Sequence, residues 1–193
     1  SEMTAKAIDI LSNNKKGFFL MVESGRIDHA HHDGNAYRAL TDTIEFSNAV
    51  RAAAQKVNLD ETLIIVTADH SHTFNIGGYP IRGNNILGLT QEVDSKGMLE
   101  EKPATDTNKK PYTTLNYANG PGYIGGERPL LTQEIVTNPN YKQEATVPLL
   151  SETHGGEDVA IFATGVNAHL IRGSMEQNWI FYVMADALRL GKK

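Results

Sequence analysis

Apolar residues recur every three or four positions in three stretches of the chain. These stretches cover residues 3–13, 36–57 and 175–189. The spacing matches the side chains on one face of an α-helix. We therefore expect a short helix near the start, a long central helix and a helix near the end.

Three other stretches, at residues 17–23, 62–67 and 158–163, each hold an unbroken apolar run next to polar or glycine end residues. Short apolar runs of this kind are typical of strands buried on both faces. The order strand, helix, strand over the first two runs implies a parallel crossover. The predicted fold class is α/β, with part of a mostly parallel sheet flanked by helices.

Residues 72–153 have a different character, because Gly, Pro, Asn, Thr and Tyr dominate there. Turn-forming residues at this density favour loops and short strands over long regular elements. A structureless stretch of this length is implausible inside a compact domain. We interpret it as an inserted subdomain of short strands and loops.

Composition narrows the possible functions. The chain has 193 residues, a formal net charge of −5 and no cysteine. The missing thiols exclude disulfides, thiol catalysis, zinc ribbons and iron–sulfur clusters. The acidic balance argues against a nucleic-acid partner, and no run of about 18 apolar residues could span a membrane. No signal peptide opens the chain, and because it starts at Ser1 rather than Met we expect it to be part of something larger.

The histidines are clustered near the ends of predicted strands. Three of the seven lie in the stretch 28–32 and two in 69–72, while His154 follows Thr153 in a third polar stretch. In a parallel α/β sheet, the loops beyond the carboxyl ends of the strands build the site. The clusters are therefore expected to converge, although solvated surface histidines remain the alternative.

The residue types in these clusters suit divalent cations. Asp28 and His32 are four apart, so a helix would place both on one face. His154 is a plausible third ligand, and three protein ligands leave the open position of a catalytic zinc site. Asp69 and His70 could hold a second ion, and carboxylate-rich positions suit Mg²⁺. Two metals about 4 Å apart would clamp the oxygens of a phosphoryl displacement.

Three further histidines have different expected roles. His31 is expected at the surface or beside a ligand rather than as a ligand. His72 is expected to orient a ligating carboxylate through its ring N–H. His169 is interpreted as structural.

Five motifs together resemble the alkaline phosphatase family. They are the stretches 22–32 (VESGRIDHAHH), 66–72 (VTADHSH), 77–83 (GGYPIRG), 119–123 (NGPGY) and 152–158 (ETHGGED). They follow the family's order over most of the chain. The similarity is greatest to the branch with a large crown insertion.

The resemblance implies a site with two zinc ions and one magnesium ion. The implied ligands are Asp28, His32 and His154 for the first zinc, Asp69 and His70 for the second zinc, and Glu23 for the magnesium. Two more positions are implied nearby, His72 beside a ligand and His29 near the substrate phosphate.

The resemblance also implies an organisation. Residues 1–77 and 149–193 are similar to the C-terminal half of an alkaline-phosphatase α/β domain, and residues 78–148 to the crown. The crown lies at the family's dimer interface, so a homodimer is implied. Export to the periplasm, the outside of the cell or its surface is implied in the same way.

The chain departs from the family's pattern at the nucleophile. No serine lies in the Asp-Ser-Ala or Asp-Ser-Gly context that the family uses. The bridging aspartate and the phosphate-holding arginine are also unmatched, and Arg26 lies inside a metal motif. We expect no catalytic nucleophile in this chain and a missing N-terminal half or companion chain, so the isolated chain should be inactive.

The expected function is metal-dependent hydrolysis of phosphate monoesters through a phosphoserine intermediate, as the resemblance implies. One alternative is a related phosphodiesterase, sulfatase or phosphomutase, which the crown-like segment disfavours. The other is a non-enzymatic zinc-binding or interaction fragment.

Overall fold

The computed structural model of the chain describes residues 1–191, which form two compact units. The first unit consists of Ser1–Glu23, Glu45–Ser71 and the residues from Glu157 onward. The second unit consists of Ser24–Ile44 and His72–Gly156. The chain passes between them within helix α3 (Ala36–Lys56), whose first part belongs to the second unit.

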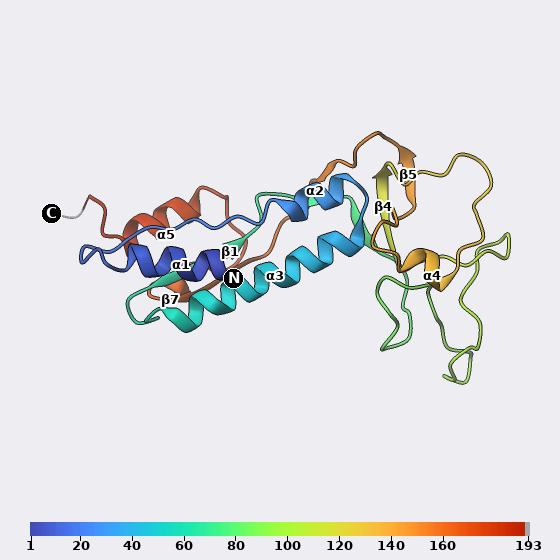
Figure 1. The fold of residues 1–193 in the computed structure, drawn as a ribbon, viewed down its shortest axis with the longest axis horizontal. Helices are drawn as coiled ribbons and strands as arrows, with labels where there is room; N and C mark the ends of the chain where they lie inside the picture. The colour runs from blue at the N-terminus through green and yellow to red at the C-terminus, as the bar shows by residue number, and fades with distance from the viewer. Residues whose placement is uncertain (192–193) are drawn as a thin grey trace. The chain divides into compact units, whose positions relative to one another are not determined.

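The first unit combines a short ladder with helices. Strand β1 (Leu63–Thr67) pairs with β7 (Ile161–Gly165) in antiparallel orientation (Figure 1). The remaining elements of this unit are α1 (Glu2–Leu11), the 3₁₀ helix η1 (Ala168–Leu170) and α5 (Trp179–Ala187).

The second unit contains a mixed sheet in the order β3-β4-β5. The central strand β4 pairs antiparallel with β3 and parallel with β5. On β4, Leu115 and Tyr117 are each only 1% exposed, so this strand lies in the core of the unit. The elements of the unit are α2 (Arg26–His32), β2 (Ser71–His72, with His72 in this unit), β3 (Phe74–Ile76), β4 (Leu115–Gly120), α4 (Gln133–Val136), β5 (Ala145–Pro148) and β6 (His154–Gly155).

Loops make up much of residues 77–114 and 121–144 (Figure 1). Isolated bridges such as Leu89–Thr113 and Thr105–Pro111 tie the first of these stretches together. A small apolar cluster of Leu89, Leu131 and Val136, with Tyr141 packed against it, joins these loops to α4. The density of turn residues in this part of the sequence therefore corresponds to short elements and loops.

All three predicted helices are confirmed, with boundaries shifted by up to a few residues, as α1, α3 and α5. The apolar run at 62–67 forms β1, and the run at 158–163 contributes to β7, which begins three residues later than predicted. The class is mixed α/β, but a mostly parallel sheet is not confirmed, because β1 and β7 are antiparallel. The predicted parallel crossover would join residues 17–23 to β1 through α3, and it does not form because residues 17–23 belong to no strand.

The predicted buried strand at residues 17–23 is wrong. Within residues 1–191 this segment is extended and belongs to no strand. Its side chains are largely exposed, at 60% for Phe19 and 71% for Met21. A strand needs neighbours that satisfy its backbone and cover its faces, and the described part of the chain supplies none at this segment.

Two glycines have conformations or contacts that other residues would not tolerate. Gly34 follows α2 with a φ of 68°, and its amide donates to the His31 carbonyl at 2.8 Å, so it ends the helix. A Cβ on Gly122 would lie 1.8 Å from the Gln143 carbonyl oxygen. The second glycine therefore allows the loop after β4 to approach residue 143.

No helix among residues 1–191 is long and apolar enough to cross a membrane.

Candidate metal centre

Three of the predicted ligands meet within the second unit. Asp28 and His32 lie on α2, and His154 lies on β6. Asp28 Oδ1 is 3.4 Å from His32 Nε2 and 3.5 Å from His154 Nε2. The two Nε2 atoms are 3.2 Å apart. One carboxylate oxygen and two imidazole nitrogens therefore form a nearly equilateral triangle.

This donor triangle fits a zinc ion in both chemistry and size. Zinc accepts imidazole and carboxylate ligands in tetrahedral geometry. Ligand atoms about 2.0–2.1 Å from a tetrahedral zinc lie roughly 3.3–3.4 Å from one another, which is close to the three observed separations. Three protein donors would leave a fourth position for water or substrate.

The orientation of His32 is set by Glu152. His32 Nδ1 donates to the Glu152 carbonyl oxygen at 2.6 Å. A carbonyl oxygen only accepts, so the His32 proton lies on Nδ1 and Nε2 keeps a lone pair. That lone pair is on the side of Asp28 and His154, as a metal ligand requires.

His72 lies between two carboxylates. Its Nε2 is 3.1 Å from Asp28 Oδ1, and its Nδ1 donates to Glu152 Oε2 at 2.7 Å. The Glu152 side chain is fully buried, and the His72 side chain is 8% exposed. Asp28 thus lies beside a buried imidazole as well as beside the two imidazoles of the triangle.

His31 packs behind this cluster. Its ring stacks on His72 with centroids 4.5 Å apart, and Nδ1 is 2.8 Å from the Tyr117 hydroxyl. Burial, followed by the neighbouring His72, lowers the pKa of His31 to about 4, so the ring is neutral at physiological pH. His29, on the same helix, is exposed.

The other three predicted ligands belong to the first unit. Asp69 is 88% exposed, and His70 Nε2 lies 3.5 Å from Asp69 Oδ2. His70 Nδ1 donates to the Ser71 carbonyl at 3.1 Å. The hydroxyl of Ser71 donates to Glu157 and lowers the pKa of that carboxyl group. Glu23 is an exposed residue at the end of the extended segment 17–23.

Glu152 is the site residue that sequence reasoning misses. In the sequence it is one of several acidic residues near His154, and nothing there marks it as buried. The available signals are its place two residues before His154 and its position at the start of the 152–158 motif. The structure distinguishes it by burial and by the number of donors that it accepts.

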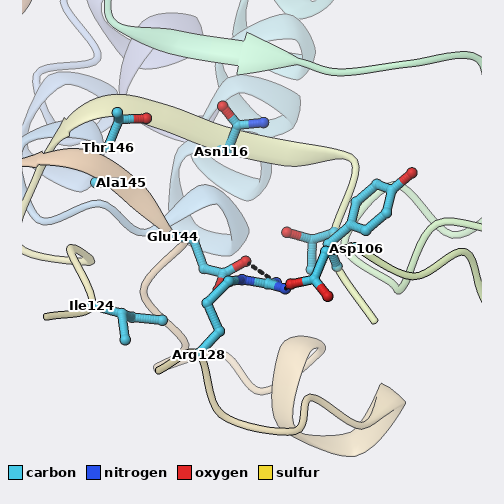
Figure 2. Close-up of a pocket in the computed structure, with 9 residues that line it drawn as sticks. Asp106, Asn116, Ile124, Arg128, Glu144, Ala145 and Thr146 are labelled. Carbon is cyan, nitrogen blue, oxygen red and sulfur yellow. Dashed lines mark hydrogen bonds and ion pairs between the residues drawn. The ribbon is translucent and has the colours of Figure 1, made fainter. Parts of the chain in front are cut away.

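A separate polar cluster in the second unit centres on Arg128. Its guanidinium donates to both oxygens of Glu144 at 2.8 and 2.6 Å and to Asp106 Oδ2 at 2.6 Å (Figure 2). The cluster lines a cavity of about 340 Å³. Because both carboxylates already bind the same guanidinium, this arrangement joins the 106–110 turn to residue 144, which directly precedes β5.

Comparisons with a family model and with known proteins point to the same family. A family model described as alkaline phosphatase matches residues 1–190. The chain is 50% identical to the tissue-nonspecific isozyme of alkaline phosphatase from Felis catus, and 48% identical to those from Homo sapiens and Rattus norvegicus. Each comparison covers 99% of this chain and 35% of the relative, so the chain spans about a third of the length of these relatives.

Proposed function

Because this chain belongs to the alkaline phosphatase family, we propose that it contributes metal ligands to an enzyme that hydrolyses phosphate monoesters. The observation that carries the proposal is the triangle formed by Asp28 Oδ1, His32 Nε2 and His154 Nε2. Its donor types and its dimensions suit zinc. A bound zinc ion would supply Lewis-acid charge next to the oxygens of a phosphate ester.

The residues of the triangle contribute in different ways. Asp28 brings a negative charge that offsets part of the charge of a divalent cation. His32 presents Nε2 because its Nδ1 is held by the Glu152 carbonyl. About half of the His154 side chain, 49%, is accessible to solvent, so the triangle is open to solvent at His154. A phosphate ester could approach from that side.

The remaining metal positions are proposed on family resemblance. Asp69 and His70 would serve a second zinc, and Glu23 would serve a magnesium ion. The exposed carboxylate of Asp69 and the neighbouring imidazole of His70 are donor types that suit this role. His72 would hold Asp28 in place, and His29 would lie near the substrate phosphate.

The proposed reaction also needs groups that this chain does not match to the family's pattern. The serine nucleophile, the aspartate that bridges two metals and the phosphate-holding arginine would come from residues outside this chain. Residues 78–148 would form a crown at a homodimer interface, and the protein would act outside the cytoplasm. These statements extend the family resemblance to the whole protein.

The test is metal-dependent turnover of p-nitrophenyl phosphate by the protein as encoded in its source. We expect activity that is lost with a chelator and restored by zinc and magnesium, and none from the 193-residue chain alone. His154→Ala should remove both tight zinc binding and activity. Unchanged zinc stoichiometry in His154→Ala would count against the assignment. Preferential turnover of a phosphodiester or sulfate ester would favour a related hydrolase, and zinc binding without any turnover would favour a non-enzymatic role.

A further inference from the structure

Glu152 is a buried carboxylate that contacts two histidines of the candidate centre through different parts of the residue. We propose that Glu152 is the positioning residue of this centre, holding His72 with its side chain and His32 with its main chain. This inference rests on the proposed function, because it concerns the same metal site. It adds a residue to the site that carries no ligand atom for the zinc triangle.

Both oxygens of the Glu152 carboxylate accept hydrogen bonds. Oε2 accepts from His72 Nδ1 at 2.7 Å, while Oε1 accepts from the Thr73 amide at 2.6 Å and the Thr73 hydroxyl at 2.8 Å. Rotation of the carboxylate would break at least two of these hydrogen bonds. Its orientation is therefore fixed, and with it the ring plane of His72.

The main chain of Glu152 forms a reciprocal pair with His32. The Glu152 amide donates to the His32 carbonyl at 2.9 Å, and His32 Nδ1 donates to the Glu152 carbonyl at 2.6 Å. The end of α2 is thereby fastened to the segment that leads into β6. Since His154 follows two residues later, the same contact sets the distance between His32 and His154.

The position of Glu152 is itself shaped by its neighbours. Gly120 has a φ of 136°, and a Cβ at this position would lie 3.1 Å from the Glu152 Cβ. The glycine thus leaves room for Glu152 beside the end of β4. On the other side of the network, His31 stacks against His72 at 4.5 Å and limits its tilt.

The consequence for the centre passes through His72. Because Nδ1 of His72 is held by Glu152, its Nε2 is directed at Asp28 Oδ1, 3.1 Å away. Asp28 belongs to the zinc triangle, so an ordered His72 ring limits the positions that this donor can take, and loss of the Glu152 contact would remove that limit. Partners of this kind, when removed, typically cost 10–100-fold in metal affinity.

The experiment compares Glu152→Gln with Glu144→Gln in the protein as encoded in its source. His72 and Thr73 donate to different oxygens of Glu152, and glutamine has an oxygen at only one of these two positions, so it cannot accept from both in this geometry. Glu144 is a matched control, because it is a partly buried glutamate of the same unit that binds Arg128 instead of a histidine. Zinc affinity is measured by competition with a chromogenic chelator, and the ring tautomers of His32 and His72 by ¹⁵N NMR of the metal-free protein.

We expect zinc affinity to fall about 10–100-fold in Glu152→Gln and to change less than about twofold in Glu144→Gln. The Nδ1–H signal of His72 should shift in Glu152→Gln alone. Thr73→Val removes one hydroxyl donor and keeps the side-chain shape, so it should give a smaller loss of zinc affinity than Glu152→Gln. This milder variant still tests the inference if Glu152→Gln fails to fold.

Equal zinc affinity in Glu152→Gln and the wild type would overturn the inference, as would equal losses in the two glutamine variants. If the wild type bound no zinc, the proposed function would fail, while the tautomer of His72 would still decide whether Glu152 positions it. An unshifted His72 signal in Glu152→Gln would then reject the positioning role.

Discussion

His32 and His154 are 122 residues apart in the sequence, yet their Nε2 atoms lie 3.2 Å apart. The His32 nitrogen carries a lone pair, because its Nδ1 donates to a carbonyl oxygen. A divalent cation bound by both nitrogens would replace this contact, in which one nitrogen donates to the other, with two metal–ligand bonds. It would also join α2 to β6, so the metal and the fold should stabilise each other.

Zinc is therefore expected to raise the stability of the protein. At a free zinc concentration 100 times the dissociation constant, the gain in the free energy of unfolding is about 2.7 kcal/mol. His154→Ala should abolish the part of this gain that comes from the Asp28, His32 and His154 triangle. The measurement is the urea midpoint with and without zinc, followed by tryptophan fluorescence or circular dichroism.

His169→Ala is the matched control for this prediction. His169 is also exposed, but it lies on η1 in the first unit. The variant should keep the full response to zinc. An equal response in wild type and His154→Ala would show that zinc acts elsewhere.

Arg128→Ala should destabilise the second unit. The guanidinium separates the carboxylates of Asp106 and Glu144, and about a quarter of its side chain is exposed. Breaking a fully buried ion pair costs 3–5 kcal/mol, so a loss of about 2–3 kcal/mol is expected at this partly exposed site. Arg51→Ala, which removes an exposed arginine that donates to Asn48, should change stability by less than about 0.5 kcal/mol. Thermal unfolding of both variants gives the comparison, and similar small effects would argue that the Arg128 cluster contributes little.

The stability of the second unit should also fall in acid through Asp106. The Lys110 amide and the Arg128 guanidinium hold the pKa of Asp106 below its usual value. A lowered folded pKa stabilises the protein above the unfolded pKa of about 3.9, and this contribution is lost as the pH falls through the folded value. Urea midpoints between pH 2 and 6 should therefore decline less steeply for Asp106→Asn than for the wild type. Parallel curves would contradict this assignment.

Gly122→Ala should be strongly destabilising for a steric reason. The added Cβ would lie 1.8 Å from a backbone oxygen of Gln143, which cannot move as a side chain can. Overpacking usually costs 1–3 kcal/mol, and we expect about 3 kcal/mol or more here. Gly125→Ala is the control, since its Cβ would meet its nearest neighbour, Tyr123, at an ordinary 3.8 Å. A loss below about 1 kcal/mol in Gly122→Ala would show that the loop can move away.

Elements whose structure depends on local pattern could be predicted from the sequence. The spacing of apolar residues over 36–57 predicts a helix, and α3 forms there. The four-residue spacing of Asp28 and His32 places both on one face of α2, because a helical turn is itself local. The strand at 17–23 could not be judged in this way. Its burial depends on neighbouring strands, which a pattern of apolar residues does not contain.

The residues of the candidate site also fall into those that local sequence identifies and those that only distant contacts reveal. The identities of Asp28, His32 and His154 follow from residue type and motif, while their role as zinc ligands stays a prediction. Glu152 could not be identified, because its importance comes from contacts with His72 and Thr73 that are distant in the sequence. The sequence alone does not distinguish a glutamate whose carboxylate is buried from one whose carboxylate is exposed.

The short ladder of the first unit has a practical consequence for anyone who prepares this chain alone. β1 consists of five β-prone, uncharged residues, Leu63–Thr67, and the extended segment 17–23 presents apolar side chains to water. Segments of this composition readily join edge to edge between molecules and form cross-β aggregates. Precipitation during expression or concentration would then reflect intermolecular strand pairing, and a charged substitution at Phe19 or Met21 should reduce it.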